Sequence, residues 1–175
     1  MRLFIAAELP EEMLDALVTT QAELRDTLRG RYVAPDMLHV TLAFLGDVPG
    51  ALVPDVISAL EAACADVGVI DASLGELGYF GRLRKATLWQ AVDGGLALVN
   101  LAETVRVQLR LGGFSFDEKD FRAHVTLMRA VDLSAVGSLP MPHIACGSID
   151  AITLFSSDLS GPHPMYEPLH RVTLG

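Results

Sequence analysis

Two copies of one tetrad, His39-Val40-Thr41-Leu42 and His124-Val125-Thr126-Leu127, stand 85 residues apart in a chain of 175 residues. Each copy lies in an apolar stretch that is typical of a β-strand. Because side chains alternate between the two faces of a strand, the histidine and the threonine of each copy point to the same side. If the two halves of the chain face each other, two imidazoles and two hydroxyls meet in one small volume. Such a set of groups is suited to acid–base chemistry on a phosphate ester.

The composition predicts a folded protein with an acidic surface. Hydrophobic residues make up 51% of the chain and charged residues 20%, which permits a sizeable core and argues against disorder. The net charge of −9 argues against a protein that binds a long nucleic acid through contacts to many phosphates. A small phosphate-bearing ligand could still bind in a locally basic cleft. The first residues lack a signal-peptide pattern, and no apolar run reaches the roughly 18 residues of a membrane span. We therefore expect a cytoplasmic protein outside membranes, with Cys64 and Cys146 as buried, reduced thiols.

Strand-like and helix-like segments alternate along the chain, and hairpin-like neighbours are frequent. Apolar spacing predicts helices within residues 10–28, 52–60 and 94–109, and strands within residues 3–7, 38–45, 70–80, 86–92, 123–129, 144–155 and 166–174. This order favours an α+β fold with antiparallel sheets over a doubly wound parallel sheet. No linker is visible, so residues 1–175 are expected to form a single domain. The repeated tetrad predicts that this domain has two pseudo-symmetric lobes.

Longer stretches around the tetrads carry a resemblance to a known family. They are residues 39–46, 121–129 and 1–6, supported by residues 31–36, 154–157 and 166–169. Together they closely resemble the two-histidine (2H) phosphoesterase superfamily, and within it the bacterial and archaeal RNA 2′,3′-cyclic phosphodiesterases, also called 2′-5′ RNA ligases. The resemblance covers nearly the whole chain, although Ala43 stands where the family often has lysine and Ala123 where it often has proline. It implies two lobes, each an antiparallel sheet backed by helices, whose histidines face each other across a central active-site cleft.

The tetrads supply the candidate catalytic residues. One of His39 and His124 would deprotonate a water molecule and the other would protonate the leaving oxygen, because imidazole titrates near neutral pH. The hydroxyls of Thr41 and Thr126 could donate hydrogen bonds to the non-bridging phosphate oxygens. Arg129, near the end of the second motif strand, is a candidate phosphate clamp because a guanidinium binds two oxygens at once.

Phe44 occupies the position in the first motif that Arg129 occupies in the second. The resemblance supports both as ligand contacts, with Phe44 packing on a base or a ribose. Simpler interpretations stand beside these: Phe44 as a core aromatic, Arg129 as a surface salt-bridge partner, and the threonines as ordinary strand residues. The basic cluster in residues 81–85 is either a solvated hairpin tip or a wall of an RNA cleft, and Arg122 could steer the ligand.

We expect a monomeric enzyme without a cofactor that is independent of metal, because this chemistry requires none and no carboxylate or cysteine cluster lies near either motif. It would hydrolyse RNA ends that carry a 2′,3′-cyclic phosphate to a 2′-phosphate, and the reverse reaction would form a 2′-5′ linkage. One alternative keeps the site but places a small cyclic nucleotide or an ADP-ribose cyclic phosphate in it. Another is a nucleotide-binding module without catalysis. A zinc site built from His39, His124 and His143 is a further alternative, although it lacks the spacing of familiar zinc sites.

Overall fold

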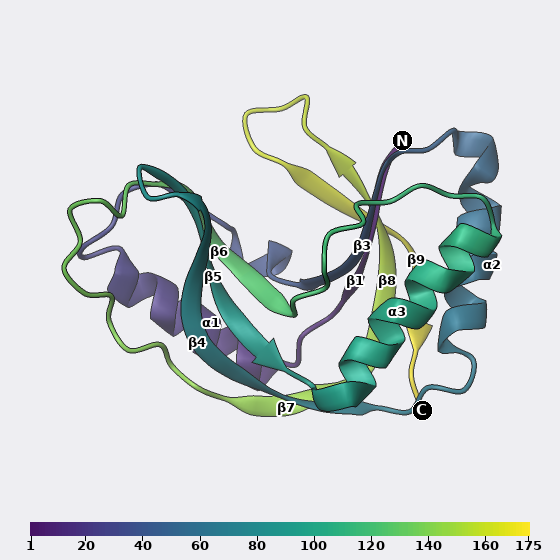
Figure 1. Cartoon of the computed structure of the whole chain (residues 1–175), viewed down its shortest axis with the longest axis horizontal. Coiled ribbons are helices and arrows are strands. Elements are labelled where there is room, and N and C mark those ends of the chain that lie inside the picture. The colour runs from purple at the N-terminus through teal and green to yellow at the C-terminus, as the bar shows by residue number, and fades with distance from the viewer.

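The computed structural model describes residues 1–175 as an α+β fold with three α-helices and a nine-stranded antiparallel sheet (Figure 1). The helices are α1 (Glu11–Leu24), α2 (Val53–Cys64) and α3 (Gly95–Leu111). The strands are β1 (Arg2–Ala7), β2 (Arg31–Tyr32), β3 (Val40–Asp47), β4 (Ile70–Arg82), β5 (Lys85–Asp93), β6 (His124–Val131), β7 (Cys146–Ile149), β8 (Ala151–Asp158) and β9 (Met165–Thr173). Their order is β7-β4-β5-β6-β3-β1-β8-β9, and β2 pairs with β6. The α+β class predicted from the sequence is confirmed.

The two motif strands, β3 and β6, are neighbours in the middle of the sheet. Their only backbone pairing joins Val40 and Val125, whereas β3 pairs along its length with β1, and β6 pairs with β5. The sheet therefore opens at its centre, and Figure 1 shows β4, β5 and β6 diverging from β1, β3 and β8. Helix α1 packs against β7 in one half. Helices α2 and α3 pack against each other in the other half, where they contact β9 and β3.

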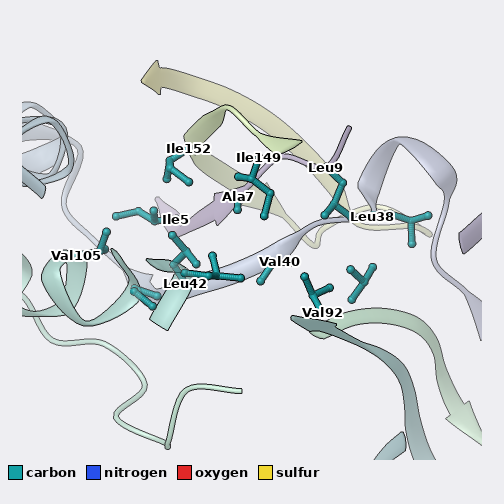
Figure 2. Packing of buried hydrophobic residues seen from close by; sticks show 14 of the residues in the cluster. Ile5, Ala7, Leu9, Leu38, Val40, Leu42, Val92, Val105, Ile149 and Ile152 are labelled. Atoms are coloured by element: carbon teal, nitrogen blue, oxygen red, sulfur yellow. The ribbon is translucent and has the colours of Figure 1, made fainter. Parts of the chain in front are cut away.

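One hydrophobic core joins the helices to the sheet. Figure 2 shows Ile5, Leu42 and Ile152, from the neighbouring strands β1, β3 and β8, projecting into this core together with Val105 of α3. Helix α3 presents one face to the sheet because its buried residues recur every three or four positions; they are Leu98, Leu101, Ala102, Val105 and Leu109. None of the three helices has the length and apolar composition needed to cross a bilayer.

Several element boundaries differ from the sequence prediction by a few residues, and two of these differences have a clear structural reason. The first helix ends at Leu24 rather than Leu28, and the chain continues as a turn in which the Leu28 N–H donates to the Leu24 carbonyl at 2.8 Å. The first motif strand does not stop before Gly46 but runs through Asp47. A register shift against β1 accommodates the positive φ of Gly46 (69°), so the ladder continues past the glycine.

The segment predicted as one strand over residues 144–155 is two strands. β7 pairs with β4 in one half of the sheet, and β8 pairs with β1 in the other, so the chain crosses between the halves at Asp150. The expectation of two buried thiols is wrong for Cys146, which is exposed on β7. Cys64 is buried on α2, and this burial raises the pKa of its thiol to about 11.

Candidate active site

A small cavity lies where β3 and β6 meet, and it gathers most of the predicted site residues. We call it the central cavity; it is lined by Val33, Met37, His39, Thr41, His124, Thr126, Arg129 and Tyr166. A larger hollow of about 920 Å³ adjoins it and is also lined by Phe44; we call this the wide cleft. The structure therefore brings five of the six predicted residues to one cavity and places the sixth in the neighbouring cleft.

The register of the motif strands explains this convergence. Val40 and Val125 face each other across the two strands, and both side chains are fully buried in the core. Because strand side chains alternate, the histidine and the threonine that flank each valine point to the opposite face. In an antiparallel pair, the residue before one valine lies across from the residue after the other. The histidine of each motif therefore lies across from the threonine of the other motif.

The imidazole of His39, which directly precedes β3, is held in one tautomer. Its Nδ1 lies 2.7 Å from the carbonyl oxygen of Met37, and its Nε2 lies 3.0 Å from the hydroxyl of Thr41. A carbonyl only accepts hydrogen bonds, so Nδ1 carries the proton and Nε2 accepts from the threonine. Burial lowers the pKa of His39 to about 4, with the charges of Arg129 and His124 acting in the same direction. His39 is therefore neutral at neutral pH.

The first residue of β6, His124, has the same support. Its Nδ1 donates to the carbonyl oxygen of Arg122 at 2.5 Å, again two residues earlier in the chain. Burial is the main reason that the pKa of His124 is lowered, and the charges of Arg129 and Arg122 lower it further. Both histidines line the central cavity, and in each neutral ring the unprotonated nitrogen is Nε2. This is the form that can accept a proton from a nucleophile.

Aromatic side chains that the sequence analysis did not assign to the site surround both imidazoles. The ring centroids of Phe4 and Tyr166 lie 5.0 and 5.6 Å from that of His39. Those of Phe80 and Trp89 lie 5.0 and 5.8 Å from that of His124. These neighbours come from strands paired through the sheet, so no local motif marks them. Their rings contribute to the desolvation that lowers the histidine pKa values.

Arg129 lies in β6 and lines both the central cavity and the wide cleft, as the phosphate-clamp hypothesis requires. It has no carboxylate within salt-bridge distance, so the simpler interpretation as a salt-bridge partner is wrong. Phe44 lines the wide cleft, but the guanidinium of Arg2 lies 4.7 Å from its ring centroid. One face of Phe44 is thus already covered by a cation.

Other polar candidates lie away from the central cavity. Arg82, Arg84 and Lys85 are exposed at the β4–β5 hairpin, and none of them lines the central cavity or the wide cleft. His143 pairs with Glu23 of α1, with its Nε2 2.8 Å from the carboxylate. No group of three or more His, Cys, Asp or Glu side chains is placed to hold a metal ion, so the three-histidine zinc alternative is not supported.

Known proteins resemble this chain over nearly its whole length. Residues 8–89 match the family model described as "LigT like Phosphoesterase". The chain is 31% identical, over 99% of its length and 96% of the relative, to the RNA 2′,3′-cyclic phosphodiesterase of Escherichia coli K12. It is 29% identical to the protein of that name in Thermus thermophilus, over 99% and 90% of the two chains.

Solved structures show the same fold. The crystal structure of TT0787 of Thermus thermophilus superimposes with a TM-score of 0.85 at 28% identity, over 99% of this chain and 98% of that one. The crystal structure of Escherichia coli LigT complexed with 3′-AMP gives a TM-score of 0.80 at 29% identity, over 99% and 97% of the two chains. The likeness thus extends over both halves of the sheet.

Proposed function

Because the chain belongs to the LigT-like phosphoesterase family, we propose that it is an RNA 2′,3′-cyclic phosphodiesterase whose reaction is carried by His39 and His124. The observation that carries this proposal is the convergence of two neutral imidazoles, each with its Nδ1 held by a backbone carbonyl, on the cavity that Arg129 also lines. The curated relatives supply the substrate class, since several carry the name RNA 2′,3′-cyclic phosphodiesterase.

The groups in the central cavity match the steps of cyclic phosphodiester hydrolysis. One histidine takes a proton from water as the water oxygen forms a bond to phosphorus. The other gives a proton to the ribose oxygen as its bond to phosphorus breaks. If the 3′ oxygen leaves, as the family resemblance implies, the product is a 2′-phosphate. Arg129 offers positive charge and the hydroxyl of Thr126 a hydrogen bond to the non-bridging oxygens, where charge accumulates in the transition state. The hydroxyl of Thr41 can do the same once it turns away from the Nε2 of His39, which it contacts in the free protein.

Substrate binding completes the protonation pattern. Both histidines are neutral in the free protein, so one is ready to act as the base but the other lacks the proton of an acid. A bound phosphate places a negative charge beside both rings, and a nearby opposite charge raises a histidine pKa. Anion binding therefore favours the protonated form, and of the two imidazoles that of His124 is the more accessible. The two groups titrate as a coupled pair, with macroscopic pKa values that belong to the site.

The fold supports a single bilobal domain with internal pseudo-symmetry. The order β1-α1-β3 in the first half, which also contains the two-residue strand β2 before β3, is repeated as β5-α3-β6 in the second. Each unit ends on a motif strand, and the two motif strands meet at the Val40–Val125 pair. The repeat is incomplete, because α2 follows the first unit whereas residues 132–145 after the second contain no helix. The pseudo-two-fold axis proposed here passes between the two valines.

The proposed ligands are RNA ends or small nucleotides that carry a cyclic phosphate. Structures of Escherichia coli LigT contain 3′-AMP, ATP and NADP⁺, which shows that this family member accepts free nucleotides. The net charge of −9 also favours a short ligand over a long RNA track. The reverse reaction, joining a cyclic phosphate to a 5′-hydroxyl in a 2′-5′ linkage, would use the same groups. The protein would act as a monomer, since one chain supplies both histidines.

The decisive experiment offers the protein an oligoribonucleotide ending in a 2′,3′-cyclic phosphate, and separately adenosine 2′,3′-cyclic phosphate. Mass spectrometry should show addition of one water, and chromatography should identify the 2′-phosphate. Turnover of the mononucleotide alone would favour the small-nucleotide alternative. Binding without turnover of either compound would favour the non-catalytic module.

A further inference from the structure

The two hollows beside the central cavity differ in charge. The hollow on the His39 side, of about 560 Å³, contains the carboxylates of Glu8 and Asp36, and its one cation, Arg171, is paired with Glu8 at 3.1 Å. The wide cleft on the other side has five cations against two carboxylates; the cations are Arg2, Arg106, Lys119, Arg122 and Arg129. An anionic chain that leaves the central cavity is therefore attracted to the wide cleft.

Most of this positive charge has no partner in the protein. Lys119 is paired with Asp117 at 3.0 Å, but the four arginines have no carboxylate within salt-bridge distance. In a chain with net charge −9, four unpaired guanidinium groups around one cleft are a local reversal of the overall charge. The cleft therefore offers charge-assisted hydrogen bonds to an anion.

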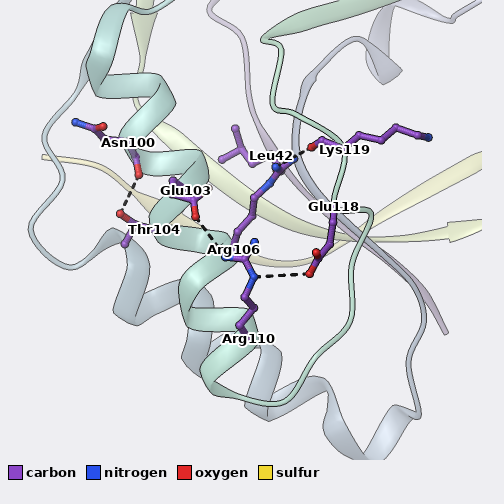
Figure 3. A network of polar contacts seen from close by, with 8 residues as sticks. All are labelled: Leu42, Asn100, Glu103, Thr104, Arg106, Arg110, Glu118 and Lys119. Atoms are coloured by element: carbon purple, nitrogen blue, oxygen red, sulfur yellow. Dashed lines mark hydrogen bonds and ion pairs between the residues drawn. The ribbon is translucent and has the colours of Figure 1, made fainter.

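Arg106 of α3 is the best organised of these cations. Its Nε donates to the Leu42 carbonyl at 3.3 Å, and its Nη1 donates to the Lys119 carbonyl at 2.9 Å. Figure 3 shows the side chain reaching from α3 to these two backbone segments. Its guanidinium also lies 5.8 Å from the ring centroids of Phe116 and Phe121. The remaining N–H groups are held in place and available to a ligand at little entropic cost.

The position of Arg106 relates it to the reaction site. Leu42, whose carbonyl holds Arg106, directly follows Thr41, whose hydroxyl lines the central cavity. Arg106 is therefore bound to the residue of β3 that directly follows one lining the central cavity, where the phosphate ester would be cleaved. Further along β3, the guanidinium of Arg2, which belongs to β1, lies over the ring of Phe44 and extends the cationic lining of the wide cleft. The cleft therefore provides a cationic path that begins at the central cavity.

We infer that the wide cleft binds the 5′-phosphate of the nucleotide whose 2′,3′-cyclic phosphate is cleaved, with Arg106 as its main contact and Arg2 as an outer one. This inference rests on the proposed function. An RNA that ends in a cyclic phosphate has further phosphates only on the 5′ side of its last nucleoside. Because the cations gather in the wide cleft, the RNA chain should leave the central cavity through the wide cleft, with its 5′ side there. The preferred substrate carries a phosphate on the 5′ oxygen of its terminal nucleoside.

The test compares kcat/KM for three substrates: adenosine 2′,3′-cyclic phosphate, the same compound with a 5′-phosphate, and the dinucleotide ApA ending in a cyclic phosphate. We expect both compounds with the added phosphate to exceed the first by about tenfold or more, the range for a hydrogen bond to a charged group. In Arg106→Gln this preference should fall toward one, and in Arg106→Lys it should be partly retained. Arg2→Gln should reduce the preference by a smaller factor.

Arg110→Gln is the matched control. Arg110 lies one turn further along α3, is paired with Glu103 and Glu118, and does not line the wide cleft (Figure 3). It should leave both the preference and the turnover of adenosine 2′,3′-cyclic phosphate unchanged. An equal kcat/KM for the first two substrates overturns the inference but leaves the proposed function standing. A preference for the dinucleotide alone also overturns it, because the second nucleoside rather than the phosphate would then be recognised.

A binding measurement separates this inference from the proposed function. The dissociation constants of adenosine 3′,5′-bisphosphate and 3′-AMP can be compared without any turnover. We expect the bisphosphate to bind about tenfold or more tightly in the wild type, and the advantage to be lost in Arg106→Gln. Equal affinities in the wild type, or an undiminished advantage in a folded Arg106→Gln protein, overturn the inference. Failure to hydrolyse any cyclic phosphate overturns the proposed function instead.

Discussion

Val40 and Val125 form the single backbone pairing between the two motif strands, and neither side chain is exposed to solvent. The polar side chains on either side of each valine face the central cavity because strand side chains alternate. The core packing of two valines thus determines how two histidines and two threonines are arranged. The site therefore depends on the pairing of β3 with β6, where the two halves of the sheet meet, and each half supplies one imidazole.

Replacing either motif histidine should remove most of the activity. His39→Gln and His124→Gln should each lower kcat by about 10²–10⁴-fold, the usual contribution of general acid–base catalysis. The double variant should be little worse than either single variant, because the two groups act in one step. The measurement is the single-turnover rate on a cyclic-phosphate oligonucleotide, with folding checked by circular dichroism.

The control is His163→Gln, because His163 is an exposed residue in the β8–β9 turn. A folded His39→Gln or His124→Gln variant with near wild-type rate would remove that residue from the mechanism.

The pH dependence of kcat/KM should be bell-shaped with an acidic optimum. This parameter reports the ionisation of the free enzyme, in which one histidine must be neutral and the other protonated. The pKa of His39 is lowered to about 4, and that of His124 is also below its usual value. The optimum should therefore lie below about pH 6.5, and activity should fall on both sides of it. A rate that stays constant to alkaline pH would contradict this assignment.

The buried imidazole of His39 should make the protein less stable in acid. Its pKa is about 4 in the folded protein and about 6.5 when unfolded. Between these values the unfolded chain binds a proton that the folded protein does not, so the free energy of unfolding falls as the pH falls. The full effect of this group is about 3 kcal/mol. Urea unfolding at several pH values should show a weaker acid dependence for His39→Gln than for wild type. Equal dependences would mean that His39 is not desolvated.

Arg129→Ala should lower kcat/KM. The lost transition-state stabilisation should be about 1.5–3 kcal/mol, the range for a hydrogen bond to a charged group. Because the charge of Arg129 lowers both histidine pKa values, its removal should also move the pH profile toward higher pH. Arg129→Lys keeps the charge but loses the bidentate geometry. It should keep the wild-type pH profile and recover only part of the rate. A rate loss without any shift of the profile would place Arg129 away from the two imidazoles.

Activity should survive metal removal. The two histidines can move both protons, and Arg129 can neutralise the phosphate charge, so the proposed steps need no Lewis acid. The measurement is kcat/KM after dialysis against excess EDTA, with the undialysed protein as the control. Loss of activity that one divalent cation restores would contradict the prediction.

The sequence alone determined the family and the α+β class, and it predicted six candidate site residues. The family and the class are confirmed, and the site residues were predictable because the pattern is local: a histidine and a threonine two residues apart share a strand face whatever the strand pairs with. A second copy half a chain away then indicated that two such faces meet. The site roles remain predictions, but the structure brings the side chains of His39, Thr41, His124, Thr126 and Arg129 to one cavity.

Only the tertiary structure decided which residues surround that cavity and how they behave. The aromatic neighbours of the histidines come from strands distant in the chain, and Arg106 reaches the cleft from a helix. The low histidine pKa values follow from burial, which depends on the packing of the whole domain. Periodicity shows which face of a strand a residue occupies, but strand order and register arise from contacts between distant segments. The charge difference between the two hollows likewise exists only once these segments are brought together.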